Sequence, residues 1–188
     1  MKIPFNDLSR IHKPIKKNVI KVLDNSIDNS EFILSSYVKS FEESYSNYTN
    51  SNYTISCSNG TDAIELVLRA LDIGVGDEVI LPTNTFIATA LAVSRTGAKP
   101  VLVDNDPFYL IDVEKIEKEI TKKTKAIIGV HLYGQQVENI TISNLCKKYN
   151  LEYIEDSAQA HGSKYKSYSP GKYGTAATYS FYPGKNLG

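Results

Sequence analysis

The sequence contains little cysteine and no excess of either charge. Only Cys57 and Cys146 are present among the 188 residues, too few and too isolated for a disulfide framework or a metal cluster. The 21 Lys and Arg residues balance 21 Asp and Glu residues, so no net field attracts nucleic acid or an anionic membrane. We therefore expect no metal site, no nucleic-acid partner and no membrane partner.

The sequence also lacks a long apolar run. No stretch approaches the ~18 consecutive apolar residues that mark a membrane span, and the opening MKIPFNDLSR contains no secretory apolar core. These absences predict a cytoplasmic protein. A chain of 188 residues suits one domain, which could bury about 70% of its unfolded surface.

Short apolar runs alternate with helical stretches along most of the chain. Two helices are predicted first, at about 14–27 and 35–48, because their apolar residues recur at helical spacing. The strands predicted after them are 53–57, 78–82, 99–104, 125–132, 151–156 and 176–181, with helices at 61–71, 85–96, 112–120 and 139–149. This alternation predicts an α/β fold, in which helices cover both faces of a mainly parallel sheet.

Polar residues follow the strands at their carboxyl ends, where open parallel sheets bind ligands. The first such group is Asn59-Gly60-Thr61, at the start of the helix 61–71. Backbone N–H groups at a helix start, with Gly60 permitting close approach and Thr61 adding a hydroxyl, can bind a phosphate. An ordinary helix cap formed by Asn59 or Thr61 explains the same residue types, so both interpretations stay open.

A second group of polar residues follows the strand 151–156. Asp156 could face a ligand cation, such as a protonated pyridine nitrogen, or it could cap the next turn. His161 could be an ordinary hydrogen-bonded histidine of the core or the surface. Phe86, which follows the strand 78–82, could belong to the core or stack on a flat ring.

The last group runs from Ser180 to Lys185 in the segment SFYPGKNLG. The Pro-Gly turn places Lys185 on a loop at a strand end, although most lysines on turns are solvated charges. Pyridoxal phosphate needs an anion cradle, a carboxylate for its ring nitrogen, a flat group against its ring and a lysine. Each need has a candidate at a strand end, so the sequence predicts a pyridoxal 5'-phosphate site.

The chain resembles the DegT/DnrJ/EryC1/StrS family of sugar aminotransferases over essentially its whole length. The motifs that carry the resemblance are IPFNDLSR, SNGTDAIELVLRAL, GDEVILPTNTFIATALAVSRTGAKPVLVD, VHLYGQ, IEDSAQAHGSKYK and SFYPGKNLG. The resemblance implies the aspartate-aminotransferase-like fold, also called PLP fold type I. It also implies conversion of a nucleotide-linked keto sugar to an amino sugar, with glutamate as amino donor, by a full-length homodimer.

The resemblance further implies a role for each candidate residue. Lys185 matches the lysine that binds the cofactor as a Schiff base, and Asp156 matches the carboxylate paired with the pyridine nitrogen. Gln159 matches a glutamine near the ring hydroxyl, and Phe86 matches the aromatic stacked on the ring. The residues that match phosphate contacts are Gly60, Thr61 and Ser180.

Two other functions stay open. One is a sugar dehydratase of the same fold; Lys185 argues against it, because some of those relatives carry histidine in place of the lysine. The other is a catalytically inactive fragment. Family members continue past the lysine into a further strand and a smaller C-terminal domain, so we expect residues 1–188 to be a single cofactor-binding large domain, truncated at its C-terminus.

Overall fold

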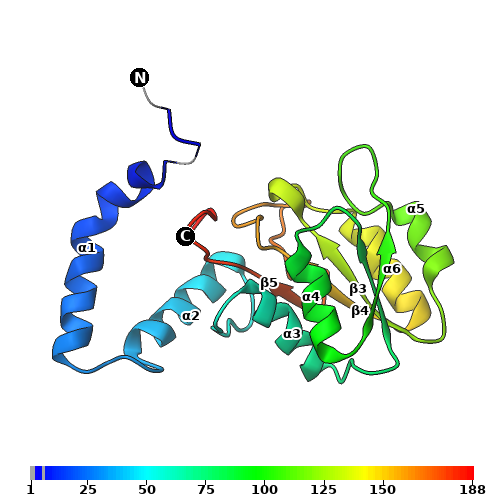
Figure 1. Ribbon diagram of the computed structural model, residues 1–188, viewed down its shortest axis with the longest axis horizontal. Helices are drawn as coiled ribbons and strands as arrows, with labels where there is room; N and C mark the ends of the chain where they lie inside the picture. Colours follow the sequence, from blue (N-terminus) through cyan, green and yellow to red (C-terminus); the bar gives the residue numbers. More distant parts are fainter. Residues whose placement is uncertain (1–2, 6) are drawn as a thin grey trace. The chain divides into compact units, whose positions relative to one another are not determined.

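The computed structural model describes residues 3–5 and 7–188 of the chain. The chain divides into two compact units, Met1–Ser56 and Cys57–Gly188, and Figure 1 gives the order of their elements. That residues 1–188 form one cofactor-binding domain stays a prediction.

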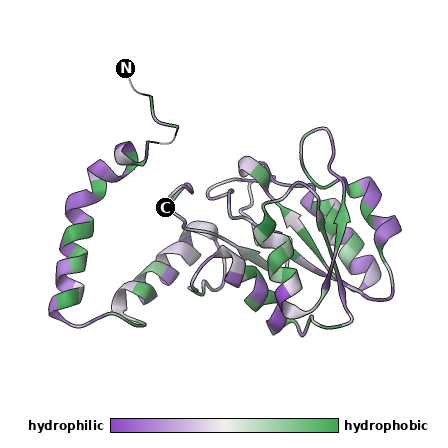
Figure 2. Ribbon diagram, in the orientation of Figure 1, coloured by the Kyte–Doolittle hydropathy of each residue, from purple (hydrophilic) through white to green (hydrophobic). Residues whose placement is uncertain are grey.

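Two helices make up most of the first unit, and both are predicted by the sequence. They are α1 (Leu8–Asp28) and α2 (Ser36–Thr49). Hydrophobic and hydrophilic residues alternate along α1 (Figure 2), none of which is buried in the chain. A hydrogen bond of 2.7 Å from Asn25 Nδ2 to Tyr37 Oη joins the two helices.

The segment 53–57 does not form the predicted strand. The backbone N–H of Ser56 donates to Oε1 of Glu42 at 2.7 Å, so it bonds to a helix side chain rather than to a neighbouring strand. The hydroxyl of Ser46 likewise donates to Thr54 Oγ1 at 2.8 Å. The prediction is wrong because an apolar run indicates an extended segment without supplying a strand to pair with it.

A five-stranded parallel sheet forms the centre of the second unit. Its strands are β1 (Glu78–Pro82), β2 (Lys99–Val103), β3 (Thr124–Val130), β4 (Glu152–Asp156) and β5 (Ala176–Thr178). Their order across the sheet is β2-β1-β3-β4-β5, and each neighbouring pair is parallel. The predicted parallel sheet is confirmed, and all five carboxyl ends meet at one edge.

Helices lie on both sides of this sheet, as the sequence predicts. They are α3 (Gly60–Ala70), α4 (Ile87–Thr96), α5 (Val113–Ile116) and α6 (Asn139–Tyr149), with short 3-10 turns η1 (Glu117–Glu119) and η2 (Leu132–Gly134). Figure 1 shows α3 and α4 on one side of the strands and α5 and α6 on the other. Among the described residues, no helix is long and apolar enough to cross a membrane.

The core of the second unit lies between the sheet and these helices. Ile80, Ile127 and Ile154 from three adjacent strands are fully buried, and they pack with Val93 of α4 and Ile142 of α6. Because helices cover both faces of the sheet, consecutive residues of β1, β3 and β4 are buried, and these strands are apolar runs in the sequence. Burial of this kind fixes the strands and therefore the positions of the residues that follow them.

Candidate active site

The candidate residues lie where parallel strands end and helices begin. Asp156 is the last residue of β4, and Gly60 is the first residue of α3. The others follow strands or precede helices at the same edge of the sheet: Thr61 in α3, Phe86 before α4, Gln159 after β4, and Ser180 and Lys185 after β5. The fold therefore gathers chemically useful groups from distant parts of the sequence at one edge.

Gly60 lies directly against Ser180. A Cβ atom at Gly60 would lie 3.0 Å from Cβ of Ser180 and 3.4 Å from the carbonyl oxygen of Tyr179. Asn59 caps α3, because its Oδ1 accepts a hydrogen bond of 2.9 Å from the backbone N–H of Asp62. The cap interpretation of this loop is therefore confirmed for Asn59, and the phosphate interpretation stays a prediction.

Asp62 ties this loop to α4. Its carboxylate accepts hydrogen bonds from the side chains of Ser58 and Asn59, and Arg95 Nη1 of α4 donates to its Oδ1 at 3.0 Å. The hydrogen bond from Ser58 contributes most to lowering the pKa of Asp62, and Asn59 and Arg95 lower it further. The ionised carboxylate therefore joins the loop before α3 to the end of α4.

Asp156 is buried and accepts hydrogen bonds on both carboxylate oxygens. Thr89 Oγ1 donates to Oδ2 at 2.7 Å, and the backbone N–H of Ala158 donates to Oδ1 at 3.2 Å. Burial raises the pKa of Asp156, whereas these two hydrogen bonds and the charge of Lys185 oppose the rise. The bond to Ala158 means that Asp156 caps the turn after β4, and the role of its carboxylate toward a ligand cation stays a prediction.

Lys185 lies in a turn beyond β5 and is half-buried. Its backbone N–H donates to the carbonyl oxygen of Tyr182 at 2.8 Å, which closes the turn. Its positive charge lowers the pKa of Asp156 and that of His161, so the ammonium group is within electrostatic reach of both. The amine of Lys185 and the buried carboxylate of Asp156 thus lie near enough for their charges to interact.

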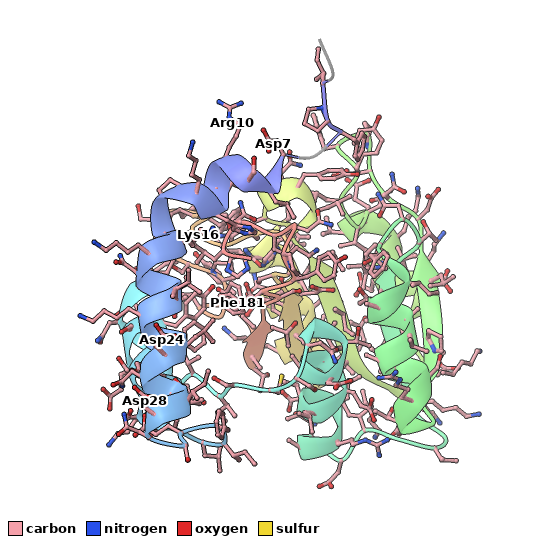
Figure 3. The ribbon with its side chains drawn as sticks, turned by 60° about the vertical axis from the view of Figure 1, so that its left-hand side comes forward. Asp7, Arg10, Lys16, Asp24, Asp28 and Phe181 are labelled. Carbon is pink, nitrogen blue, oxygen red and sulfur yellow. The ribbon has the colours of Figure 1, made fainter. Side chains whose placement is uncertain are left out.

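His161 holds the segment that leads to Lys185. Its Nε2 donates to the carbonyl oxygen of Ser180 at 2.8 Å. Its ring packs 5.2 Å from the ring of Tyr179 and 4.9 Å from that of Phe181, which Figure 3 labels. Burial lowers the pKa of His161, and the Lys185 charge lowers it further. His161 is therefore a hydrogen-bonded histidine, and its contacts fix the backbone at Ser180.

Two further candidates lie at this edge with contacts of their own. Gln159 Oε1 accepts a hydrogen bond of 2.8 Å from the backbone N–H of Tyr133. Phe86 is 69% exposed, so the core interpretation of this residue is wrong and its ring is open to a ligand. In the part of the chain that the structure describes, no hydrogen bond brings Gln159 to Asp156 or Lys185.

Thr89 is a residue that the sequence reasoning missed. It is 1% exposed and bonds directly to Asp156. A signal for it exists in the motif TNTFIATA, because Thr85 and Thr89 are four residues apart, as on one face of a helix. Their hydroxyl oxygens lie 2.8 Å apart in the structure.

A buried histidine and a buried glutamate are direct neighbours of Asp156. His131 and Glu155 are both fully buried, and His131 Nε2 lies 2.9 Å from Glu155 Oε2. The backbone N–H of Val137 donates to His131 Nδ1 at 3.3 Å, so Nε2 carries the proton that Glu155 accepts. Backbone N–H groups of Tyr173 and Gly174 donate to the other oxygen, Glu155 Oε1. The hydrogen bond between His131 and Glu155 could not be predicted from the positions of these residues at strand ends.

Comparison with known proteins gives one consistent family. The profile of the DegT/DnrJ/EryC1/StrS aminotransferase family matches residues 13–188. The chain is 49% identical over 180 residues to a protein of Aneurinibacillus thermoaerophilus named dTDP-3-amino-3,6-dideoxy-alpha-D-galactopyranose transaminase, covering 95% of this chain and 50% of that protein. It is 48% identical to the "Pleiotropic regulatory protein" of Geobacillus stearothermophilus, covering 100% of this chain and 51% of that protein.

A solved structure agrees with these relatives. The crystal structure of ntda from Bacillus subtilis with its bound cofactor PMP superimposes with a TM-score of 0.93 at 38% sequence identity, covering 100% of this chain and 42% of that one. The aminotransferase-like fold is therefore confirmed. The chain spans about half the length of the curated relatives that it matches.

Proposed function

Because the chain belongs to the DegT/DnrJ/EryC1/StrS aminotransferase family, we propose that it is the cofactor-binding large domain of a nucleotide-sugar aminotransferase. The observation that carries this proposal is the meeting of three features at one edge of the sheet. They are the buried carboxylate of Asp156, the amine of Lys185 and the close contact of Gly60 with Ser180.

The residues at this edge fit pyridoxal phosphate. At Gly60 the absence of a side chain leaves the helix start open beside Ser180, whereas a Cβ atom would fill that space. A helix start of this kind favours a phosphate group. Ser157, next to Asp156, has the one buried side-chain oxygen without a hydrogen-bond partner in the described part of the chain. Polar groups at this depth are almost always bonded, so a missing partner supports a bound group nearby.

The proposed roles follow from the chemistry of each side chain. When bound, pyridoxal phosphate supplies an electron sink for bond changes at the substrate carbon that carries the amino group. Asp156 would hold the proton on the ring nitrogen through an ionised carboxylate oxygen. Lys185 Nζ would bind the cofactor covalently and later carry a proton to and from the reacting carbon, which requires part of the amine to be neutral. Gly60, Thr61 and Ser180 would hold the phosphate, Phe86 would lie on the ring, and Gln159 would lie near the ring hydroxyl.

A nucleotide-linked keto sugar is the proposed substrate. The Aneurinibacillus thermoaerophilus relative, which is named as a dTDP-amino-sugar transaminase, supports this class. Glutamate as the amino donor, a homodimer and a location in the cytoplasm are parts of the same proposal. Lys185 favours amine transfer over sugar dehydration, because the lysine is the group that moves the proton.

Cofactor attachment is the first test. The purified chain is mixed with pyridoxal phosphate, reduced with borohydride and digested, and the labelled peptide is identified by mass spectrometry. Lys185 should carry the label, and the exposed Lys172 serves as a control, since Lys172→Ala should leave labelling unchanged. Labelling of another lysine in preference to Lys185 contradicts the proposed site.

Amine transfer is the second test. Residues 1–188 can replace the matching half of the Aneurinibacillus thermoaerophilus relative. The two proteins are 49% identical over this matching part. The hybrid is assayed for formation of 2-oxoglutarate from glutamate with a set of nucleotide-linked keto sugars. Amine transfer that depends on Lys185 supports the proposal, whereas dehydration of the sugar without 2-oxoglutarate would favour the dehydratase.

A further inference from the structure

Thr89 connects α4 to the carboxylate of β4. Its Oγ1 lies 2.7 Å from Asp156 Oδ2 and 2.8 Å from Thr85 Oγ1. Thr89 is 1% exposed and Asp156 is 5% exposed, so water does not screen this contact. The three polar groups form a chain that begins before α4 and ends on the carboxylate.

The direction of this chain follows from the count of protons. A threonine hydroxyl has one proton, and that of Thr89 is used in the hydrogen bond that it donates to the carboxylate of Asp156. Thr85 must then donate to Thr89, because the proton of Thr89 is already used. Hydrogen bonds in such a series polarise one another and strengthen the last bond. The last bond here falls on the carboxylate oxygen, where negative charge is concentrated.

The same contact opposes the effect of burial on Asp156. Burial favours the neutral acid and raises the pKa of Asp156, whereas the hydrogen bond from Thr89 is the largest influence in the other direction. The other groups near Asp156 are the Ala158 N–H in the turn after β4, the imidazole of His131 directly after β3 and the charge of Lys185 beyond β5. Thr89 is therefore the residue of α4 that stabilises the ionised carboxylate of Asp156.

We infer that Thr89 is a positioning residue that, supported by Thr85, keeps Asp156 ionised and holds its Oδ2 in place. Its consequence for catalysis rests on the proposed function, in which an ionised Asp156 holds the proton of the ring nitrogen. The series of hydrogen bonds from Thr85 through Thr89 to Asp156 is present in the protein without cofactor. The two can therefore be tested separately.

The test measures the ionisation of Asp156 without cofactor. The chain is labelled with 13C at the aspartate side-chain carboxyl carbon, and the signals are followed by NMR as pH is raised. The signal that disappears in Asp156→Asn is assigned to Asp156. Thr89→Val, which has the same shape without the hydroxyl, should bind a proton at Asp156 about tenfold more tightly. Thr89→Ser keeps the donor and should restore the original midpoint.

Thr96 offers a matched control on the same helix. It is also buried, and its hydroxyl donates to the backbone carbonyl of Val93 at 2.8 Å rather than to a carboxylate. Thr96→Val should therefore lower stability without moving the titration of Asp156. An unchanged midpoint in folded Thr89→Val, or an equal shift in Thr96→Val, overturns the inference.

A second variant covers the case in which Thr89→Val does not fold. Thr85 is half-buried, and Thr85→Val removes only the donor to Thr89. It should move the Asp156 midpoint in the same direction by a smaller amount, and a folded Thr85→Val with no shift counts against the chain of hydrogen bonds. Pyridoxal phosphate binding is measured separately by absorbance. Failure of the cofactor to bind contradicts the proposed function, whereas the titration alone decides the role of Thr89.

Discussion

Gly60 and Ser180 are in contact although they are far apart in the sequence: a Cβ atom at Gly60 would lie 3.0 Å from Cβ of Ser180. Contacts that close are tighter than most that real side chains make. The pair joins the start of α3 to the segment beyond β5, which continues to Lys185. The start of α3 therefore lies close to the segment that leads to Lys185.

Gly60→Ala should weaken cofactor binding more than it changes stability. The new methyl group would press on Ser180 and on the carbonyl oxygen of Tyr179, and overpacking costs about 1–3 kcal/mol. Alanine is a better helix former than glycine by up to about 1 kcal/mol, which offsets part of that cost in the folded chain. We expect the affinity for pyridoxal phosphate, measured by absorbance titration, to fall by about tenfold.

Gly76→Ala is the control for that prediction. Gly76 has a φ of 95° with nothing within 4 Å of an added Cβ, and it precedes β1 at the opposite edge of the sheet. Alanine there is strained by the backbone conformation alone and should lower the free energy of unfolding by about 1 kcal/mol or more. Cofactor affinity should stay unchanged. Equal affinities for the wild type and Gly60→Ala would contradict the proposed phosphate site.

Asp156→Asn should change how stability depends on pH. Burial raises the pKa of Asp156 above its ordinary value of 3.8, so between these two pKa values the folded chain binds more protons than the unfolded chain. The contribution of Asp156 to stability is therefore full below pH 3.8 and is lost as pH rises through the pKa of the folded state. The free energy of unfolding of the wild type, relative to Asp156→Asn, should fall with rising pH and then level off.

Urea denaturation of both proteins at a series of pH values from about 3.5 to 7 measures this difference. Comparing the two proteins removes the contributions of other carboxylates, such as Asp62, whose pKa is lowered. A difference that rises with pH would mean that hydrogen bonds from Thr89 and Ala158 outweigh burial at Asp156.

Much of the fold and the edge that carries the site could be predicted from the sequence. Buried parallel strands are apolar runs, and their carboxyl ends locate residues such as Asp156 without knowledge of what they touch. What the sequence did not predict depends on long-range pairing. Thr89 and Asp156, for example, are 67 positions apart in the sequence. The strand β5 ends at Thr178, three residues before the predicted end at 181. Beyond it, the carbonyl oxygen of Ser180 accepts a hydrogen bond from His161 rather than from a neighbouring strand.

The two cysteines should differ strongly in reactivity. Cys57 is exposed, whereas Cys146 is buried in α6. Burial, with the nearby charge of Glu152 adding to it, raises the pKa of the Cys146 thiol to about 12, so very little thiolate forms at neutral pH. A thiol reagent at pH 7–8 should modify one cysteine quickly in the folded chain and the second only after denaturation. Rapid modification of both in the folded chain would place Cys146 at the surface.

Glu155→Gln should destabilise the chain because the amide cannot replace the carboxylate. Glu155 accepts hydrogen bonds on both oxygens, from Gly174 N–H on one and from His131 Nε2 on the other. A glutamine has one acceptor oxygen, so its NH₂ group must face one of these donors. His131 could avoid the conflict by moving its proton to Nδ1, but Nδ1 would then face the N–H of Val137. Each arrangement leaves a buried donor without an acceptor.

The expected loss in the free energy of unfolding is about 1–3 kcal/mol, the cost of leaving one buried polar group unsatisfied. Urea denaturation at pH 7 measures it, with Glu152→Gln on the same strand as the control. Glu152 Oε2 accepts from the hydroxyl of Thr175 at an exposed position, and a glutamine oxygen can accept that bond equally well. Glu152→Gln should therefore cost less than about 1 kcal/mol. If Glu155→Gln is as stable as the wild type, the two oxygens of Glu155 are not both required as acceptors, which contradicts this account of the pair.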